Sequence, residues 1–541
     1  MHIMKRTALF VTAVVCGVVA LGFIPTFTLF GMQTEDADIF SELRLEENIV
    51  EEQVEYVADF EQLEAQIAIA EAHIADTSTL AEPIPVRYEW SVEGVRHAST
   101  SKRSAHLRSR DFVTENDVVD FEDFDTLSTT RLDNFIDKLA SGKPVRIAFM
   151  GDSFVEGDII TCDLRDMLQA RFGGRGVGFV TADIPFTTVR KSIKRNSSGW
   201  KTYSVMKPKS ASEAARENFF IAGYLADGSA GATTRWQATN AYPTLDSCST
   251  ARILFMSRDT SRVEVVLADT LRQEFLIAGD ERVREIYVEG PVDDLRVRVL
   301  EGNILCYGAS MEGEGGVIVD NYSMRSNNGH AIFGTSASVN RQIDEMLGYD
   351  LVVLQYGLNI MQPGQRGYSS YRNQLCNMIA YAERCFPNAA IVVVGVSDRW
   401  VKNEETDKYE PIGSVDALTS YQRAAADSCN VAFWNTSRVM ENLGGMPAFV
   451  SNGWAAKDYT HINYAGGKRI AKAFTESIYL RVYANLLQRE MAERQRREQS
   501  AAIHSEATPA APSADSNALP MEMNAPYTME EEVIAPEVVE E

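Results

Sequence analysis

Three short, mostly apolar runs that each end at a glycine-containing turn constrain the fold of this chain more than any other feature. The runs and their glycines are Val145–Met150 with Gly151, Leu351–Gln355 with Gly357, and Ala390–Val394 with Gly395. Such runs are typical of strands that are buried on both faces of a parallel sheet. Helical patterns follow the last two runs, at about 369–386 and 415–428. This alternation predicts an α/β fold with a doubly wound, mainly parallel sheet, whose site lies at the carboxyl ends of the strands.

The pattern changes between about residues 186 and 312. Short alternating segments, such as Arg262–Leu267 and Leu295–Leu300, are separated there by turns rich in Asp, Gly and Ser. We therefore expect a β-sandwich-like insert at 186–312 within a catalytic domain at 129–485. An insert also explains the length of 541 residues, which is too long for one ordinary core.

Residues 1–33 are predicted to form a transmembrane signal-anchor. Residues 7–32 carry no charge over 26 positions, enough for a helix to cross a hydrocarbon core of about 30 Å. Lys5 and Arg6 precede this run and acidic residues follow it. The positive-inside bias then places the rest of the chain outside the cytoplasm, in the periplasm or at the cell surface. A cleavable signal peptide is the alternative.

Two further segments flank the catalytic domain. Residues 34–128 are predicted to form a helical stalk and a linker, because apolar residues recur at helical spacing only within the acidic stretch 36–76. Pairing of the stalk in a coiled coil is an alternative to a lone helix. Residues 486–541 are predicted to contain a charged helix end and, beyond about residue 499, a disordered acidic tail.

Charge and cysteine spacing exclude several kinds of partner and site. The formal net charge of −24 argues against nucleic acid, which needs a concentrated basic surface. The seven cysteines form no C-x-x-C pair and no Cys/His cluster, so the sequence gives little support for zinc. The alternatives for the insert are a Cys248–Cys306 disulfide and buried thiols.

Ser153 is the candidate nucleophile. A serine hydroxyl is a weak nucleophile at neutral pH, so it needs an exposed turn, a nearby base and donors around the developing oxyanion. Ser153 follows the first apolar run directly, in Gly151-Asp152-Ser153, and a helix is expected to begin within 155–170. The same tripeptide also occurs in ordinary turns, so other residues must support the assignment.

His461 is the better candidate for the base. Only His330 and His461 fall inside the predicted α/β region, and Asp458 lies three residues before His461. An Asp in this position can orient the imidazole and stabilise its charge. The alternative is an ordinary surface loop before a helix at about 468–480.

Two loop residues are candidates for oxyanion donors. Asn359 follows the second apolar run in Gly357-Leu358-Asn359, so its amide can point into the same crevice as Ser153. Gly329 follows the apolar segment Gly316–Asp320 and can present a backbone N–H. Each is also an ordinary turn residue.

These four blocks together resemble the SGNH, or GDSL-type, hydrolase family. In that family the blocks supply a nucleophile, two oxyanion contributors and an acid/base pair. The resemblance implies that Ser153 is the nucleophile and also donates its backbone N–H to the oxyanion. It further implies that Gly329 and Asn359 are the other donors, and that Asp458 and His461 complete the triad.

The resemblance covers about residues 130–200 and 313–480. Ile360 stands where the family often has Asp after Gly-x-Asn, and Phe154 stands where the family name has Leu. The extended Ser block and the Lys-Asp-Tyr-Thr-His block are similar to those of bacterial peptidoglycan O-acetylesterases and O-acetyltransferases that carry a β-rich insert.

The implied function is a serine esterase that removes O-acyl groups, with O-acetyl the expected group, from cell-envelope carbohydrate through an acyl-enzyme. An O-acetyltransferase that uses the same triad, with a membrane-bound acyl-donor partner, is an alternative. A non-catalytic glycan-binding envelope protein and a membrane lipase are the others. No metal or organic cofactor is expected, because serine, imidazole and fixed dipoles supply the chemistry.

Overall fold

The three apolar runs lie side by side in a six-stranded sheet. The order of its strands is β15 (Val317–Ser323), β5 (Val145–Gly151), β16 (Leu351–Gln355), β17 (Ala390–Val394), β20 (Ala432–Trp434) and β4 (Glu122–Asp123). All neighbours pair in parallel except β20 and β4, which are antiparallel. Every residue of β5, β16, β17 and β20 is buried. The prediction of an α/β fold with a mainly parallel sheet is confirmed.

The structure is a computed structural model, and it describes only part of the chain. The described residues are 28–29, 32–33, 84–92, 107–112, 118–185, 190–245 and 248–506.

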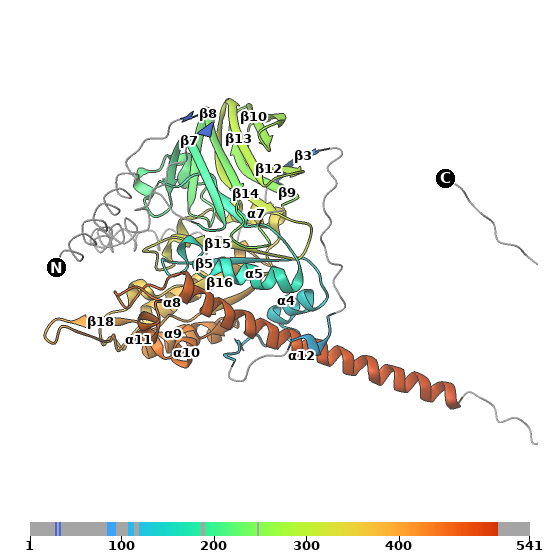
Figure 1. Ribbon diagram of the computed structural model, residues 1–541, viewed down its shortest axis with the longest axis vertical. Helices are drawn as coiled ribbons and strands as arrows, with labels where there is room; N and C mark the ends of the chain where they lie inside the picture. Colours follow the sequence, from blue (N-terminus) through green and yellow to red (C-terminus); the bar gives the residue numbers. More distant parts are fainter. Residues whose placement is uncertain are drawn as a thin grey trace, which may run out of the picture. The chain divides into compact units, whose positions relative to one another are not determined.

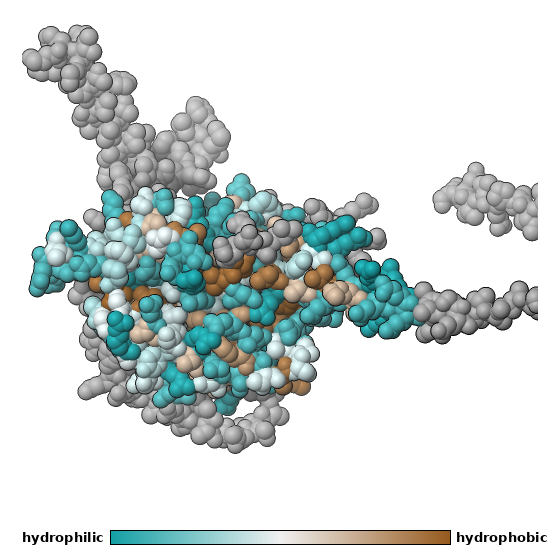
Figure 2. All heavy atoms as spheres, turned by 90° about the horizontal axis from the view of Figure 1, so that it is seen from below, coloured by the Kyte–Doolittle hydropathy of each residue, from teal (hydrophilic) through white to brown (hydrophobic). Residues whose placement is uncertain are grey.

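Helices pack around the parallel sheet (Figure 1). They include α4 (Arg131–Ala140), α5 (Thr161–Phe172), α7 (Ala337–Leu347), α8 (Ser369–Cys385), α9 (Val415–Ser428) and the part of α12 (Tyr464–Glu506) up to Leu487. The helices predicted at 369–386 and 415–428 correspond to α8 and α9. The Phe474 ring of α12 packs on Phe149 of β5 and Trp434 of β20. The face of the molecule in Figure 2 is mostly hydrophilic, with hydrophobic residues in scattered groups.

A second sheet contains ten strands. They are β3 (Val86–Ser91), β6 (Gly178–Thr181), β7 (Ile193–Ser204), β8 (Tyr224–Ala238), β9 (Thr250–Ser257), β10 (Ser261–Leu267), β11 (Leu271–Ile277), β12 (Asp280–Glu289), β13 (Asp294–Glu301) and β14 (Asn303–Glu312). All pairs are antiparallel except β12 with β3. Both sheets lie in one compact unit that ends at Leu487, and Gln488–Glu541 form a second unit. The boundaries 129–485 and 186–312 therefore stay predictions.

Two strands come from the segment predicted as stalk and linker. β3 forms an edge of the ten-stranded sheet, and β4 forms an edge of the parallel sheet. Neither strand was predicted from the sequence. β4 has only two residues, and the partner of β3 lies almost 200 residues further along the chain, so pairing over long range determines both.

A buried cluster around Arg146 joins the two sheets. Arg146 of β5 donates to Glu312 of β14 at 2.6 Å and to Asp320 of β15 at 2.7 Å, and Asp320 also accepts the Phe179 N–H of β6 at 2.7 Å. Burial disfavours the charged guanidinium, but the two carboxylates outweigh burial and raise the pKa of Arg146 well above its usual value. The cluster is satisfied by hydrogen bonds, which a buried charge requires.

The terminal predictions are tested only in part. The short strands β1 (Thr28–Leu29) and β2 (Met32–Gln33) pair antiparallel, so these residues are extended where the anchor helix was predicted to end. The rest of 7–32, the stalk at 36–76 and the tail beyond 506 lie outside the described residues. In the described ranges, no helix combines the length and apolar character needed to cross a bilayer.

α12 continues past residue 499, where the disordered tail was predicted to begin. Ala501 and Ala502 favour helix, which explains the longer element. Cys248 and Cys306 were predicted to form a disulfide or to be buried thiols. Both are buried, and no disulfide joins them.

Candidate active site

Ser153 lies in the turn that follows β5, at the carboxyl end of the parallel sheet. The turn requires glycine at Gly151, because a Cβ there would lie 2.7 Å from a Val155 side-chain carbon and 3.3 Å from the Gln355 carbonyl oxygen. The Asp152 carboxylate accepts the Phe154 N–H at 2.9 Å and holds the turn closed. Ser153 is half-buried, so its hydroxyl is positioned yet accessible.

The helix expected to begin within 155–170 is α5, which begins inside that range at Thr161. Residues Glu156–Asp158 form a single 3-10 turn before it. Gly157 and Asp158 have φ values of 67° and 69°, a left-handed backbone that an α-helix does not contain. The first helical amides therefore do not follow Ser153 directly.

The structure brings the three predicted triad residues together. The Ser153 Oγ lies 3.2 Å from the His461 Nε2, and the His461 Nδ1 lies 2.7 Å from the Asp458 Oδ2. The other Asp458 oxygen accepts the backbone N–H groups of Thr460 at 2.9 Å and His461 at 3.0 Å. This arrangement favours the tautomer with a proton on Nδ1, which leaves Nε2 free to accept the serine proton.

Asp458 is held in its charged form. Burial alone would raise the pKa of this carboxyl, but hydrogen bonds from His461 and Thr460, together with the charge of His461, lower the pKa below its usual value. The carboxylate can therefore stabilise the imidazolium that forms when His461 takes a proton.

The predicted oxyanion donors are near Ser153 but differ in availability. The Asn359 Nδ2 donates to the Asp152 Oδ2 at 3.3 Å and to the Asn327 carbonyl at 3.0 Å, so Asn359 lies beside the serine turn. The Gly329 N–H donates to the Asn327 Oδ1 at 2.9 Å and is already engaged. The Ser153 N–H makes no hydrogen bond to any described residue. The oxyanion roles of Gly329 and Asn359 stay predictions, because Asn327 must release the Gly329 N–H and one of the two Asn359 Nδ2 bonds must open.

Three residues of the site were not singled out from the sequence. Asp152 and Asn327 hold Asn359, as described above, and Arg399 donates to the Leu358 carbonyl at 3.1 Å. Burial lowers the pKa of Arg399, while the charge of Asp458 acts in the opposite direction. Asp152 stood inside the Gly-Asp-Ser tripeptide and could have been recognised there. The sequence around Arg399 carries no comparable signal.

Asp152 gives a pH-dependent test of the site. Burial is the main cause that raises the pKa of Asp152 from 3.8 to about 7. The folded chain therefore keeps a proton that the unfolded chain loses above pH 4, and folding stability should fall as the pH rises from about 4 to about 7. At about 1.4 kcal/mol per pKa unit, this shift corresponds to a loss of about 4 kcal/mol.

Asp152→Asn removes the titrating group, so the variant should lack this loss. Urea denaturation of both proteins between pH 4 and pH 8 measures the difference. Parallel pH profiles for the two proteins would contradict the burial-raised pKa of Asp152.

Comparison with known proteins supports the fold. No protein-family model and no curated protein sequence matches the chain. A solved structure described as a peptidoglycan O-acetylesterase in action superposes with a TM-score of 0.56 and 20% identity, covering 67% of this chain and 99% of that one.

Two further solved structures are more distant. A family two carbohydrate esterase from Cellvibrio japonicus has a TM-score of 0.21 and 10% identity, covering 55% of this chain and 99% of its own. A putative GDSL-like lipase from Parabacteroides merdae has a TM-score of 0.23 and 17% identity, covering 30% of this chain and 73% of its own. At these scores neither establishes a common fold, whereas the first structure shares the fold of this chain.

Proposed function

We propose that this chain, which has an SGNH/GDSL-type hydrolase fold, is a serine O-acyl esterase or acyltransferase that acts on carbohydrate. The observation that carries the proposal is the contact between the Ser153 Oγ and the His461 Nε2 at 3.2 Å, with Asp458 on the far side of the imidazole at 2.7 Å. A hydroxyl, a base and an orienting carboxylate in this order are the requirements for nucleophilic catalysis by serine.

The proposed reaction has two steps. His461 takes the Ser153 proton while the serine oxygen attacks the ester carbonyl. The oxyanion is stabilised by the Ser153 N–H and by Asn359, once the substrate displaces one acceptor of its Nδ2 group. The tetrahedral intermediate collapses to an acyl-enzyme, and the alcohol leaves with the proton from His461. Water or a sugar hydroxyl then gives its proton to His461 and attacks the acyl-enzyme, which releases the acyl group and restores Ser153.

The finer proposal is that the substrate is O-acetylated carbohydrate of the cell envelope. It is supported by the resemblance of the Ser and His blocks and by the fold shared with a structure described as a peptidoglycan O-acetylesterase. The uncharged run at 7–32 supports an anchored, extracytoplasmic location, which we keep as part of the proposal. For transfer instead of hydrolysis, the chain would need an acyl donor from a membrane-bound partner.

Mass spectrometry of an O-acetylated glycan incubated with the purified full-length protein tests this function. We expect loss of acetyl from the glycan, with free acetate in solution if water is the acceptor. If a sugar hydroxyl is the acceptor, acetyl should appear on an added unacetylated glycan instead. A protein that neither removes nor transfers acetyl, and does not turn over an aryl acetate, would contradict the proposal.

A further inference from the structure

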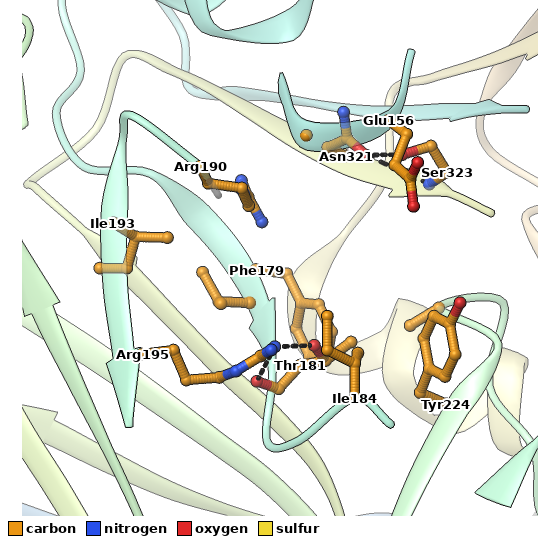
Figure 3. Close-up of a pocket in the computed structure, with 13 residues that line it drawn as sticks. Glu156, Phe179, Thr181, Ile184, Arg190, Ile193, Arg195, Tyr224, Asn321 and Ser323 are labelled. Carbon is orange, nitrogen blue, oxygen red and sulfur yellow. Dashed lines mark hydrogen bonds between the residues drawn. The ribbon is translucent and has the colours of Figure 1, made fainter. Parts of the chain in front are cut away.

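An open pocket with a volume of about 100 Å³ lies between the two sheets (Figure 3), and its wall includes Glu156 and Gly157, which follow the serine turn. Its wall on the catalytic side includes Glu156, Asn321 and Ser323, and its wall on the side of the ten-stranded sheet includes Arg190 and Arg195. The mechanism proposed above uses none of these five side chains.

The pocket adjoins the nucleophile through backbone contacts. Glu156 is three residues after Ser153 in the chain, and Ser323 of β15 is the register partner of Gly151 in β5. The Asn321 side chain donates to the Val155 carbonyl at 2.9 Å, which ties the pocket wall to the loop that follows Ser153. A substrate with its ester at Ser153 can therefore place a neighbouring group in the pocket.

Arg195 brings a positive charge to the pocket and has no direct counter-ion in the part of the chain that the structure describes. Its Nη1 donates to the Thr181 Oγ1 at 2.7 Å, while its Nε and Nη2 make no hydrogen bond to any described residue. Among the described residues, no carboxylate oxygen lies within 4.0 Å of its guanidinium. Burial lowers the pKa of Arg195 to about 10, against the opposing charge of Asp183. The guanidinium has therefore lost part of its hydration and keeps donors for an anion.

Arg190 adds to this positive potential. It donates to the Asp158 Oδ2 at 2.9 Å, but Arg165 shares the same carboxylate at 3.3 Å. The one acidic side chain among the described pocket residues, Glu156, is paired with Arg325 at 2.7 Å. Two guanidinium groups thus face one side of the pocket (Figure 3), while the Asp183 carboxylate near Arg195 accepts the Ser197 and Thr202 hydroxyls and forms no ion pair with a described residue.

We propose that this pocket binds a carboxylate group of the acylated glycan, so that the preferred substrate is an acidic saccharide such as an O-acetylated uronic acid. A planar guanidinium with free donors matches a carboxylate in charge and shape. A single negative charge suits the pocket better than a doubly charged phosphate, because Glu156 lies on its wall. The inference rests on the proposed function for the ester chemistry at Ser153.

Substrate discrimination tests the inference. We expect the full-length protein to have a higher kcat/KM for an O-acetylated methyl glucuronoside than for the matching O-acetylated methyl glucoside. In Arg195→Gln the ratio of these two kcat/KM values should fall about tenfold or more, because a charged hydrogen bond to the carboxylate is lost. Arg195→Lys should keep part of the preference, since the charge remains without the planar fork.

Lys194→Gln is the matched control. Lys194 precedes Arg195 on β7 and is exposed, and successive strand residues point to opposite faces, so this variant removes the same charge away from the pocket. Its ratio should equal that of the unmodified chain. An equal loss in Lys194→Gln and Arg195→Gln, or no preference for the acidic sugar in the unmodified chain, would overturn the inference.

Calorimetry with unacetylated methyl glucuronoside separates this inference from the proposed function. Binding of the uronoside, with weaker or no binding of methyl glucoside, supports the pocket even if no acyl ester is turned over, and equal binding of both overturns it. If an aryl acetate is hydrolysed but the uronoside does not bind, only the inference fails. This measurement on the unmodified chain also applies if the Arg195 variants do not fold.

Discussion

Replacing Ser153 with alanine is expected to reduce kcat for an aryl acetate by about five to six orders of magnitude. Loss of a serine nucleophile removes the covalent route, and only the weaker catalysis from oxyanion donors and binding remains. The Ser153 hydroxyl contacts His461, and this contact serves the reaction. We therefore expect the fold to survive removal of the hydroxyl. Initial rates with 4-nitrophenyl acetate measure kcat, and circular dichroism checks folding.

Ser420→Ala is the control for this variant. Ser420 is exposed on α9, and its hydroxyl donates only to the Asp416 carbonyl in the same helix. The control should keep the rate of the unmodified protein. If Ser153→Ala kept more than about one hundredth of the rate, the nucleophile would have to be another group.

Asp458→Asn is expected to reduce kcat by about four orders of magnitude. The asparagine oxygen can still accept the Thr460 and His461 N–H groups, so the loop should keep its conformation. Its NH₂ group would face the His461 Nδ1 as a donor, which places the imidazole proton on Nε2 and removes the base. The same aryl acetate assay measures the loss.

Two comparisons make the Asp458 result specific. Asp407→Asn changes an exposed carboxylate in the hairpin that joins β18 (Trp400–Asn403) to β19 (Lys408–Pro411), and should leave kcat unchanged. Combining Asp458→Asn with Ser153→Ala should cost no more than Ser153→Ala alone, because triad members act as one unit. Additive losses, or a loss below tenfold for Asp458→Asn, would show that Asp458 does not orient His461.

The parallel strands were predictable because strands that are buried on both faces have nearly continuous apolar sequences. β16 and β17 are almost wholly apolar, and the helices that follow them have clear periodicity. The edge strands β3 and β4 have no such apolar run, and the strands that they pair with lie far along the chain. The helix predicted to begin within 155–170 starts there at Thr161, after Gly157, whose left-handed backbone does not fit an α-helix.

The candidate site was predictable where its catalytic residues belong to short sequence motifs. Ser153 and the Asp458–His461 pair lie within local motifs, and the structure brings these motifs into contact. The engagement of the Gly329 N–H by Asn327 depends on the folded loop and left no sequence signal. The same holds for Arg195, which has no ion-pair partner among the described residues, because its surroundings in the fold and not its neighbours in the chain determine this.

Labelling with a fluorophosphonate is the most direct test of whether His461 and Asp458 activate Ser153. Peptide mass spectrometry of the full-length protein should find the label on Ser153, and His461→Gln should abolish labelling while the protein remains folded. An unlabelled Ser153 in the folded protein, or labelling that persists without His461, would contradict the catalytic account and favour a non-catalytic glycan-binding protein.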